Sequence, residues 1–95
     1  MALAPAANFK VRSDPSLAWD SVVDAASYKV CWGTSTGSYP NSQNVGNVTQ
    51  VRVRVLSPEL AHGTLYYMVV RAVDSGNNES PNSNEIQVRN GGQIG

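Results

Sequence analysis

Residues 65–74 read Leu-Tyr-Tyr-Met-Val-Val-Arg-Ala-Val-Asp, and this stretch decides the fold. It is rich in β-branched and aromatic residues and contains no Gly or Pro, which predicts a β-strand. Its apolar content on both sides predicts a central strand, along which side chains alternate between two faces. The uncharged set, which we assign to the core, is Tyr66, Met68, Val70 and Ala72; the opposite set is Tyr67, Val69, Arg71 and Val73.

Length, charge and cysteine content limit the class of protein. A chain of 95 residues makes one domain. Seven basic and seven acidic residues balance, so no overall field favours nucleic acid or an anionic membrane as a partner. No apolar run approaches the ~20 residues of a transmembrane helix, and residues 1–7 lack the features of a signal peptide. Cys31 is the only cysteine, so no internal disulfide forms.

Short apolar or alternating segments, separated by turn residues, extend in both directions from this stretch. No segment keeps a 3.6-residue period, so we expect no helix. The pattern predicts strands at residues 8–12, 16–20, 27–33, 48–56, 65–74 and 84–89, and a short edge strand or loop at 39–47. Together they predict an all-β, immunoglobulin-like sandwich of seven antiparallel strands.

The expected domain spans residues 8–89, between a leader or linker at 1–7 and a Gly-rich linker or tail at 90–95. Its core takes the inward side chains of every strand and one residue of the connector at 57–64. These are Phe9, Val11, Leu17, Trp19, Tyr28, Val30, Trp32, Val51, Val53, Val55, Leu60, Tyr66, Met68, Val70, Ala72, Ile86 and Val88.

Four motifs occur in an order that resembles the fibronectin type III domain, and the resemblance covers nearly the whole chain. Leu17-Ala18-Trp19-Asp20 is similar to the second-strand Trp motif, and Tyr28-Lys29-Val30-Cys31-Trp32-Gly33 to the third-strand aromatic motif. Residues 60–66, Leu-Ala-His-Gly-Thr-Leu-Tyr, resemble the segment that carries the family's tyrosine corner. Residues 71–75, 78–80 and 83–85 resemble the last hairpin of bacterial members. The structural marks implied are Trp19, Tyr28, Trp32, Leu60 and Tyr66.

The resemblance has departures. His62 stands where the family usually has Pro, and the segment from Val55 to Leu60 is longer than usual. The family's adhesive Arg-Gly-Asp is absent, because the last hairpin loop reads Asp74-Ser75-Gly76-Asn77-Asn78; integrin binding is therefore not implied. In the tyrosine corner that the motif implies, the Tyr66 hydroxyl bonds a backbone group of the preceding loop.

The sequence predicts neither a catalytic residue nor a cofactor or metal site. His62 is the only histidine, and we interpret it as an exposed turn residue. Cys31 is expected to be an unpaired thiol on an outward strand face. The acids around two turns, at positions 20 and 24 and at 74, 79 and 85, lack the spacing of calcium ligands. Asn47-Val48-Thr49 and Asn78-Glu79-Ser80 are glycosylation sequons, which arise easily by chance in an Asn-rich chain.

The outer face of the sheet that holds the strands predicted at 27–33 and 65–74 is a candidate interaction face, because its side chains are more apolar than a solvated face requires. Ordinary β-propensity on a central strand explains this composition equally well. If the face is an interface, Val69→Lys should abolish contact and leave folding intact. Arg52 and Arg54 form a basic stripe on the other sheet, which we interpret as a solvated edge. The candidate interaction face comprises Lys29, Cys31, Tyr67, Val69, Arg71 and Val73.

The resemblance implies a non-catalytic module, a spacer or a protein- or carbohydrate-binding unit of a larger extracellular or cell-surface protein. Its partners would be neighbouring domains, another protein or carbohydrate. The alternative is a stand-alone structural subunit, such as a phage tail or capsid-decoration protein of a virion, or an extracellular filament subunit. That subunit would assemble through the candidate interaction face.

Overall fold

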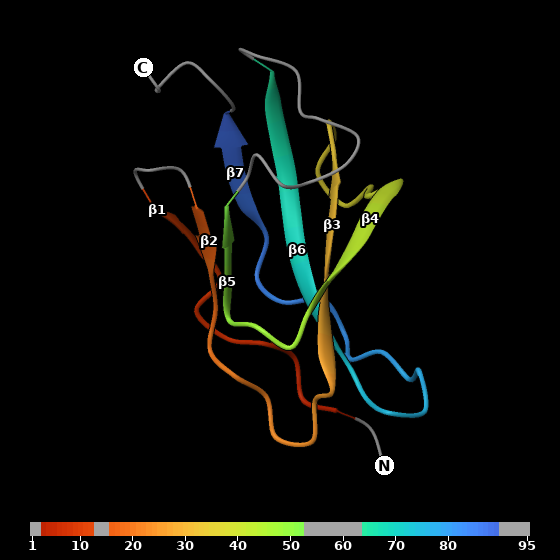
Figure 1. Cartoon of the computed structure of the whole chain (residues 1–95). Helices are drawn as coiled ribbons and strands as arrows, with labels where there is room; N and C mark the ends of the chain where they lie inside the picture. The colour runs from red at the N-terminus through yellow and green to blue at the C-terminus, as the bar shows by residue number, and fades with distance from the viewer. Residues whose placement is uncertain (1–2, 13–15, 53–63, 90–95) are drawn as a thin grey trace.

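The computed structural model describes residues 3–12, 16–52 and 64–89, and these form two antiparallel β-sheets packed face to face (Figure 1). The three-stranded sheet has the order β1-β2-β5, and the four-stranded sheet has the order β4-β3-β6-β7. The described residues include no helix that could span a bilayer. The strands are β1 (Lys10–Arg12), β2 (Ser16–Ala18), β3 (Ser27–Gly33), β4 (Asn41–Gly46), β5 (Gln50–Arg52), β6 (Leu65–Val73) and β7 (Ile86–Arg89).

The predicted fold class is confirmed: the described part of the chain is an all-β sandwich of seven antiparallel strands. The segment at 39–47, predicted as an edge strand or loop, contains the edge strand β4. The strand predicted at 48–56 is seen as β5, and its residues beyond Arg52 lie outside the described ranges.

The stretch at 65–74 occupies the centre of the larger sheet. β6 pairs with β3 from Ser27↔Val73 to Gly33↔Tyr67, and on its other side with β7 from Leu65↔Arg89 to Met68↔Ile86. Because β7 pairs with β6 only as far as Met68, the backbone groups of β6 that follow on this edge take their partners from outside the sheet. The alternation predicted for this strand is confirmed: Met68, Val70 and Ala72 join the core.

The core lies between the sheets and is built around four aromatic rings. Phe9 packs edge-on against Trp19 with ring centroids 5.9 Å apart, and Trp19 lies 5.6 Å from Tyr28. Trp32 is buried with them. Such rings supply the volume that a short chain needs to fill a sandwich. Among the predicted core residues, ten are buried as expected: Phe9, Leu17, Trp19, Tyr28, Val30, Trp32, Met68, Val70, Ala72 and Val88.

The edges of the core differ from the sequence-based expectation. Val11 is 39% exposed, so its prediction as a core residue is wrong. It pairs with Leu17 but sits on the edge strand β1, where no further strand covers it. Leu3 and Ala6 are buried in the core cluster, although the sequence pattern assigns residues 1–7 to a leader. Val51, Tyr66 and Ile86 pack against the core half-buried, and Val53, Val55 and Leu60 lie outside the described residues.

Candidate functional site

The strand register brings the six residues of the candidate interaction face together on the outer face of the four-stranded sheet. Lys29 lies opposite Arg71 and Cys31 opposite Val69 in the β3–β6 pair. Tyr67 and Val73 follow in alternation on β6, at the levels of Gly33 and Ser27. The opposite sides of both strands carry core residues such as Val30 and Val70. The placement that the alternation predicts is therefore present in the structure.

The apolar members of this face are covered rather than exposed. Val69 is 1% exposed, Cys31 3% and Val73 5%. A Lys at position 69 would bury its ammonium group, so Val69→Lys is now expected to impair folding. The burial of Val69 argues against the expectation that this substitution leaves the fold intact, which rests on sequence alternation and does not show what lies above a strand.

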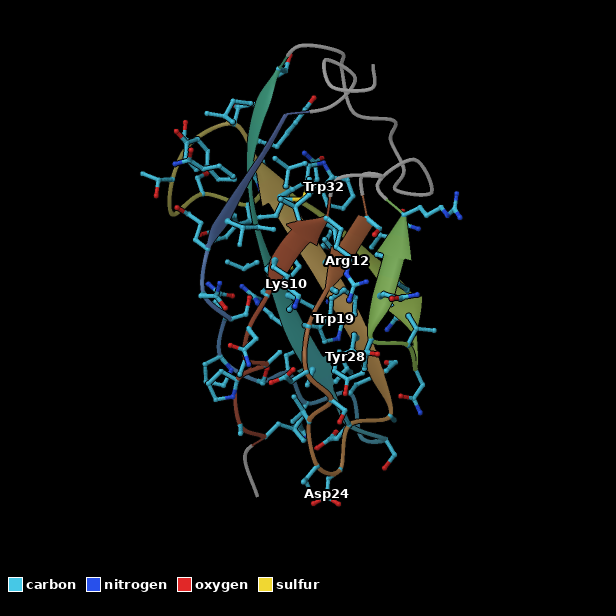
Figure 2. The ribbon with its side chains drawn as sticks, turned by 90° about the vertical axis from the view of Figure 1, so that its left-hand side faces the viewer. Lys10, Arg12, Trp19, Asp24, Tyr28 and Trp32 are labelled. Atoms are coloured by element: carbon cyan, nitrogen blue, oxygen red, sulfur yellow. The ribbon has the colours of Figure 1, made fainter. Side chains whose placement is uncertain are left out.

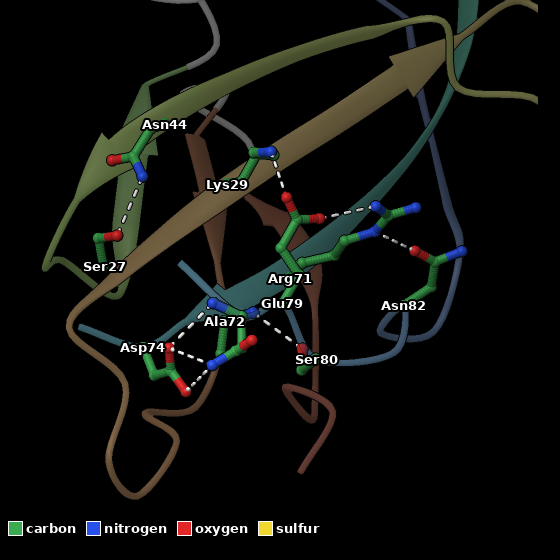
Figure 3. Close-up of polar contacts among 10 residues, drawn as sticks. Ser27, Lys29, Asn44, Arg71, Ala72, Asp74, Glu79, Ser80 and Asn82 are labelled. Carbon is green, nitrogen blue, oxygen red and sulfur yellow. Dashed lines mark hydrogen bonds and ion pairs between the residues drawn. The ribbon is translucent and has the colours of Figure 1, made fainter. Parts of the chain in front are cut away.

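A polar network links Lys29 and Arg71 on the same sheet face (Figure 3). The Lys29 Nζ lies 2.5 Å from Glu79 Oε2, and the Arg71 Nη1 lies 2.8 Å from Glu79 Oε1. The Arg71 Nε also donates to Asn82 Oδ1 at 2.6 Å. Lysine and arginine carry long apolar stems, which cover the strand while their charged ends stay in water. The outer face carries these polar groups beside the buried Cys31, Val69 and Val73, and its Tyr67 is half-buried, so the role of this face in interactions stays a prediction.

The network sets the protonation of the groups within it. Hydrogen bonds from Lys29 and then Arg71 lower the pKa of Glu79, so this carboxylate stays charged. The hydrogen bond to Glu79 raises the pKa of Arg71. Burial raises the pKa of the Cys31 thiol, although Arg71 and Lys29 act against it. Cys31 is a free, buried thiol on the outward side of β3, and a protonated, buried thiol is a poor nucleophile.

The Glu85 side chain holds the turn between β3 and β4 of the same sheet. Its carboxylate accepts hydrogen bonds from the Thr36 Oγ1 at 2.7 Å, from the Gly37 N at 3.0 Å and from the Tyr39 hydroxyl. Led by the bond from Tyr39, these contacts lower the pKa of Glu85. A residue just before β7 thereby fixes the turn that leads into β4, although β6 and β3 lie between these two strands in the sheet.

The hairpin between β6 and β7 is built by side chains that replace backbone partners (Figure 3). The Ala72 N donates to Ser80 Oγ at 2.9 Å, and the Ser80 N donates to Ala72 O at 2.8 Å. Ser83 repeats this arrangement with Val70, at 2.9 and 3.0 Å. Both serines are buried. The motif residues at 78–80 and 83–85 were the only sequence signal for this role, which alternation alone does not reveal.

Asp74 organises the tip of the same hairpin. Its Oδ1 accepts from the Gly76 N and from the Asn78 N, both at 2.9 Å. Asn77 then adopts a φ of 66°, a left-handed conformation that Asn tolerates better than most residues. Hydrogen bonds from the Asn78 backbone and side chain lower the pKa of Asp74. The hydrogen bonds that this carboxylate accepts therefore stabilise the turn.

A shallow groove lies at the end of the sandwich that carries the β6–β7 hairpin tip. Residues 3–5 and 7, 20–24 and 74–75 line it, including the carboxylates of Asp20, Asp24 and Asp74. Asp20 accepts a hydrogen bond from Asn8 Nδ2 at 2.7 Å. Within residues 3–12, 16–52 and 64–89, no group of His, Cys, Asp and Glu could hold a metal ion. His62 lies outside these ranges.

The structural marks of the predicted motifs take defined positions. The Tyr28 hydroxyl accepts a hydrogen bond from the Val22 N at 2.8 Å, and the Trp19 Nε1 is buried without a partner among the described residues. Leu60 lies outside the described residues, so the tyrosine corner at Tyr66 stays a prediction.

Comparison with known proteins identifies solved structures that share this architecture. No family model and no curated protein sequence matches the chain. Among solved structures, a Fn3-like protein from Clostridium thermocellum superposes with a TM-score of 0.75 and 27% sequence identity, covering 94% of each chain. A myokine structure superposes with a TM-score of 0.63 at 17% identity, covering 90% of this chain and 95% of that one.

The third similar structure contains several domains. The FN1-FN3 domains of chicken CNTN1 superpose with a TM-score of 0.58 at 21% identity, and the match covers 93% of this chain but 30% of that one. This chain therefore corresponds to a fraction of that protein. The strand order, the two sheets and these three likenesses show that the chain has the fibronectin type III fold.

Proposed function

We propose that the chain is a non-catalytic module of a larger extracellular or cell-surface protein, in which it acts as a rigid spacer. The observation that carries this proposal is the structural likeness to the FN1-FN3 domains of chicken CNTN1, of which this chain covers 30%. The extracellular location is proposed from the sequence resemblance.

The course of the chain supports a spacer role. Residues 3–5 lie beside the loops at 20–24 and 74–75, at one end of the sandwich. Arg89 pairs with Leu65, at the opposite end of the nine-residue strand β6 (Figure 1). Nine residues of strand extend roughly 30 Å. A segment preceding residue 3 and a segment following Arg89 would be separated by about that distance.

The segment that leads into β1, residues 3–9, is also fixed to the domain. The Asp20 N donates to Ala7 O at 3.0 Å, and Leu3 and Ala6 are buried in the core. The side chain of Asn84 holds the next residues at Phe9 through two further hydrogen bonds. A junction held in this way transmits the orientation of a preceding domain instead of absorbing it in a flexible linker.

The mass of the natural polypeptide tests the proposal. Antibodies raised against the folded chain should detect, in its source, a protein much larger than 95 residues, and intact mass spectrometry should confirm that size. Antibody pre-adsorbed with the purified chain is the control. A natural polypeptide of the mass of this chain would overturn the proposal and favour the stand-alone structural subunit.

A further inference from the structure

Among the strands of the described residues, β1, β5, β4 and β7 form the edges of the two sheets, and β4 differs from the others in charge. β1 carries Lys10 and Arg12, β5 carries Arg52, and β7 ends in Arg89. Figure 2 shows Lys10 and Arg12 on β1, at the front of the molecule. β4 reads Asn-Ser-Gln-Asn-Val-Gly, which includes neither a charged residue nor a Pro. Because charges and Pro on an edge strand oppose pairing with another chain, β4 lacks the protection that the other edges have.

The ladder of the four-stranded sheet determines which backbone groups of β4 point outward. The N–H and C=O of Val70 both bond Ser83, on the β7 side of β6. Successive residues of a strand direct their backbone groups to opposite edges, so Val69 bonds its β3 partner Cys31. Because the N–H and C=O of Cys31 point to β6, those of its β4 partner Ser42 point away from the sheet.

Asn44, two residues further along β4, has the same backbone orientation as Ser42, and both residues are exposed. The side chain of Asn44 is held in place by two hydrogen bonds. Its Oδ1 accepts from the Gly46 N at 2.9 Å, and its Nδ2 donates to Ser27 Oγ at 2.9 Å (Figure 3). Because these partners lie along β4 and toward β3, the amide is directed away from the open edge. The edge therefore offers the N–H and C=O of Ser42 and Asn44 to a further strand.

We propose that β4 pairs antiparallel with β4 of a second copy of this chain, which joins the four-stranded sheets of the two copies into one. The register shift of the β3–β4 pair comes after Asn44, so residues 41–44 form a regular ladder. A two-fold axis at Gln43 places Ser42 of each copy opposite Asn44 of the other, where the two residues exchange both of their backbone hydrogen bonds. This arrangement brings no like charges of β4 together.

A second copy fits this edge better than a foreign peptide does. A strand that is added to a sheet edge gains affinity from backbone hydrogen bonds, but its selection depends on the side chains beside it. The outward residues of β4, Ser42 and Asn44, are small or already hydrogen-bonded, and they carry no charge that would select a particular sequence. For a second copy the backbone itself selects the register, because the axis at Gln43 pairs both outward residues of each strand.

Sedimentation velocity of the purified chain tests for the dimer. Pairing through two short strands buries less than the roughly 1,200 Å² of a stable interface, so we expect a weak dimer with a Kd of about 0.1–1 mM. The chain should sediment as a monomer at about 10 μM and increasingly as a dimer toward about 1 mM, as that Kd requires. A chain that remains monomeric at the highest concentration would overturn the proposal and leave this edge to an extended peptide of another protein.

Proline variants locate the interface. Ser42→Pro removes an N–H that points outward, so it takes no hydrogen bond from the β3–β4 ladder, and edge strands tolerate Pro at such positions. It should weaken dimerisation by about tenfold or more, because each copy loses a donor. The matched control is Gln87→Pro on the other edge of the sheet, since Gln87 lies between Ile86 and Val88, whose backbone groups bond β6. The control should change the Kd less than twofold, and equal weakening by both variants would overturn the proposal.

A charge swap separates pairing from folding. In the proposed register the Ser42 side chains of the two copies lie diagonally across the axis, about 7 Å apart, where like charges oppose pairing and opposite charges support it. Ser42→Lys alone and Ser42→Glu alone should each dimerise severalfold more weakly than the parent. An equimolar mixture of the two variants should recover the association, measured by sedimentation with one variant fluorescently labelled. A mixture that associates no better than either variant alone would overturn the proposal.

Discussion

The Asn84 side chain pairs with the backbone of Phe9 in the manner of a neighbouring strand. The Phe9 N donates to Asn84 Oδ1 at 3.1 Å, and Asn84 Nδ2 donates to Phe9 O at 2.9 Å. Phe9 precedes β1 of one sheet and Asn84 precedes β7 of the other, so a single amide links the two sheets along one side. A side-chain amide provides an acceptor and a donor on two separate atoms, so it can pair with the N–H and the C=O of one residue.

Asn84→Ala should lower the free energy of unfolding by about 1 kcal/mol or more, because both backbone groups of Phe9 lose their partner. Asn84→Asp should be no better, since a carboxylate accepts from the Phe9 N but opposes the Phe9 carbonyl. Urea unfolding measures both variants against Asn47→Ala, an exposed loop change expected to stay within about 0.5 kcal/mol. An Asp variant as stable as the parent would show that the donor half of the pair contributes nothing.

Ser80→Ala and Ser83→Ala should each cost about 1–3 kcal/mol, because each leaves a backbone N–H of β6 unsatisfied in a buried position. Amide hydrogen exchange gives a local check: the Ala72 amide should lose protection in the first variant and the Val70 amide in the second. Ser75→Ala, in the exposed turn, is the control and should change neither amide. If the two amides keep their protection, the serine hydroxyls are not their partners.

Sequence periodicity predicts the fold because the information is local. A strand buried on one side must alternate, and residues 65–74 show which side faces the core. The same local rule fails for Val11, because alternation does not distinguish an edge strand from a covered one. It also misses Leu3 and Ala6, whose burial depends on where the chain crosses the end of the sandwich and not on any repeat.

The candidate interaction face shows the limit of the same rule for function. Alternation places Val69 and Cys31 on an outer face, and the structure confirms the side. The ion pairs on this face depend on Glu79, which is eight residues from Arg71 and fifty from Lys29 in the sequence and bridges both. A contact between residues so far apart in the sequence depends on the path of the hairpin through space. Turn residues predict that a hairpin is present, but they do not predict that path.

Gly33→Ala should destabilise the domain by about 1–3 kcal/mol, the usual range for overpacking. A Cβ at this position would lie 2.2 Å from Ser38 O and 2.7 Å from the Pro40 Cδ, so the turn held by Glu85 would have to move. Gly37→Ala is the comparison: it has open space but a φ of +77°, and should cost about 1 kcal/mol from backbone strain alone. Thermal unfolding that ranks Gly37→Ala as the more damaging change would contradict this packing.

Glu79→Gln should lower stability at neutral pH and make no difference in acid. The pKa of Glu79 is lowered in the folded state, so the folded protein binds fewer protons than the unfolded chain across the acid range. Its contribution is complete above the unfolded pKa of about 4.3 and is lost as the pH falls through the lower folded value. Lys29 and Arg71 then face each other as like charges, both in the variant and in the acidified parent.

Urea midpoints at pH 7 should therefore differ by the equivalent of about 0.5–1 kcal/mol, the range for exposed ion pairs, and should converge as the pH falls through the lowered pKa of Glu79. Asp74 and Glu85 also have lowered pKa values, but they remain in both proteins, so the difference isolates Glu79. Salt at 0.5 M should shrink the gap at pH 7, because it screens exposed charges. A gap that persists unchanged when Glu79 is protonated would contradict a role of its charge, since a protonated carboxyl and an amide differ little in shape.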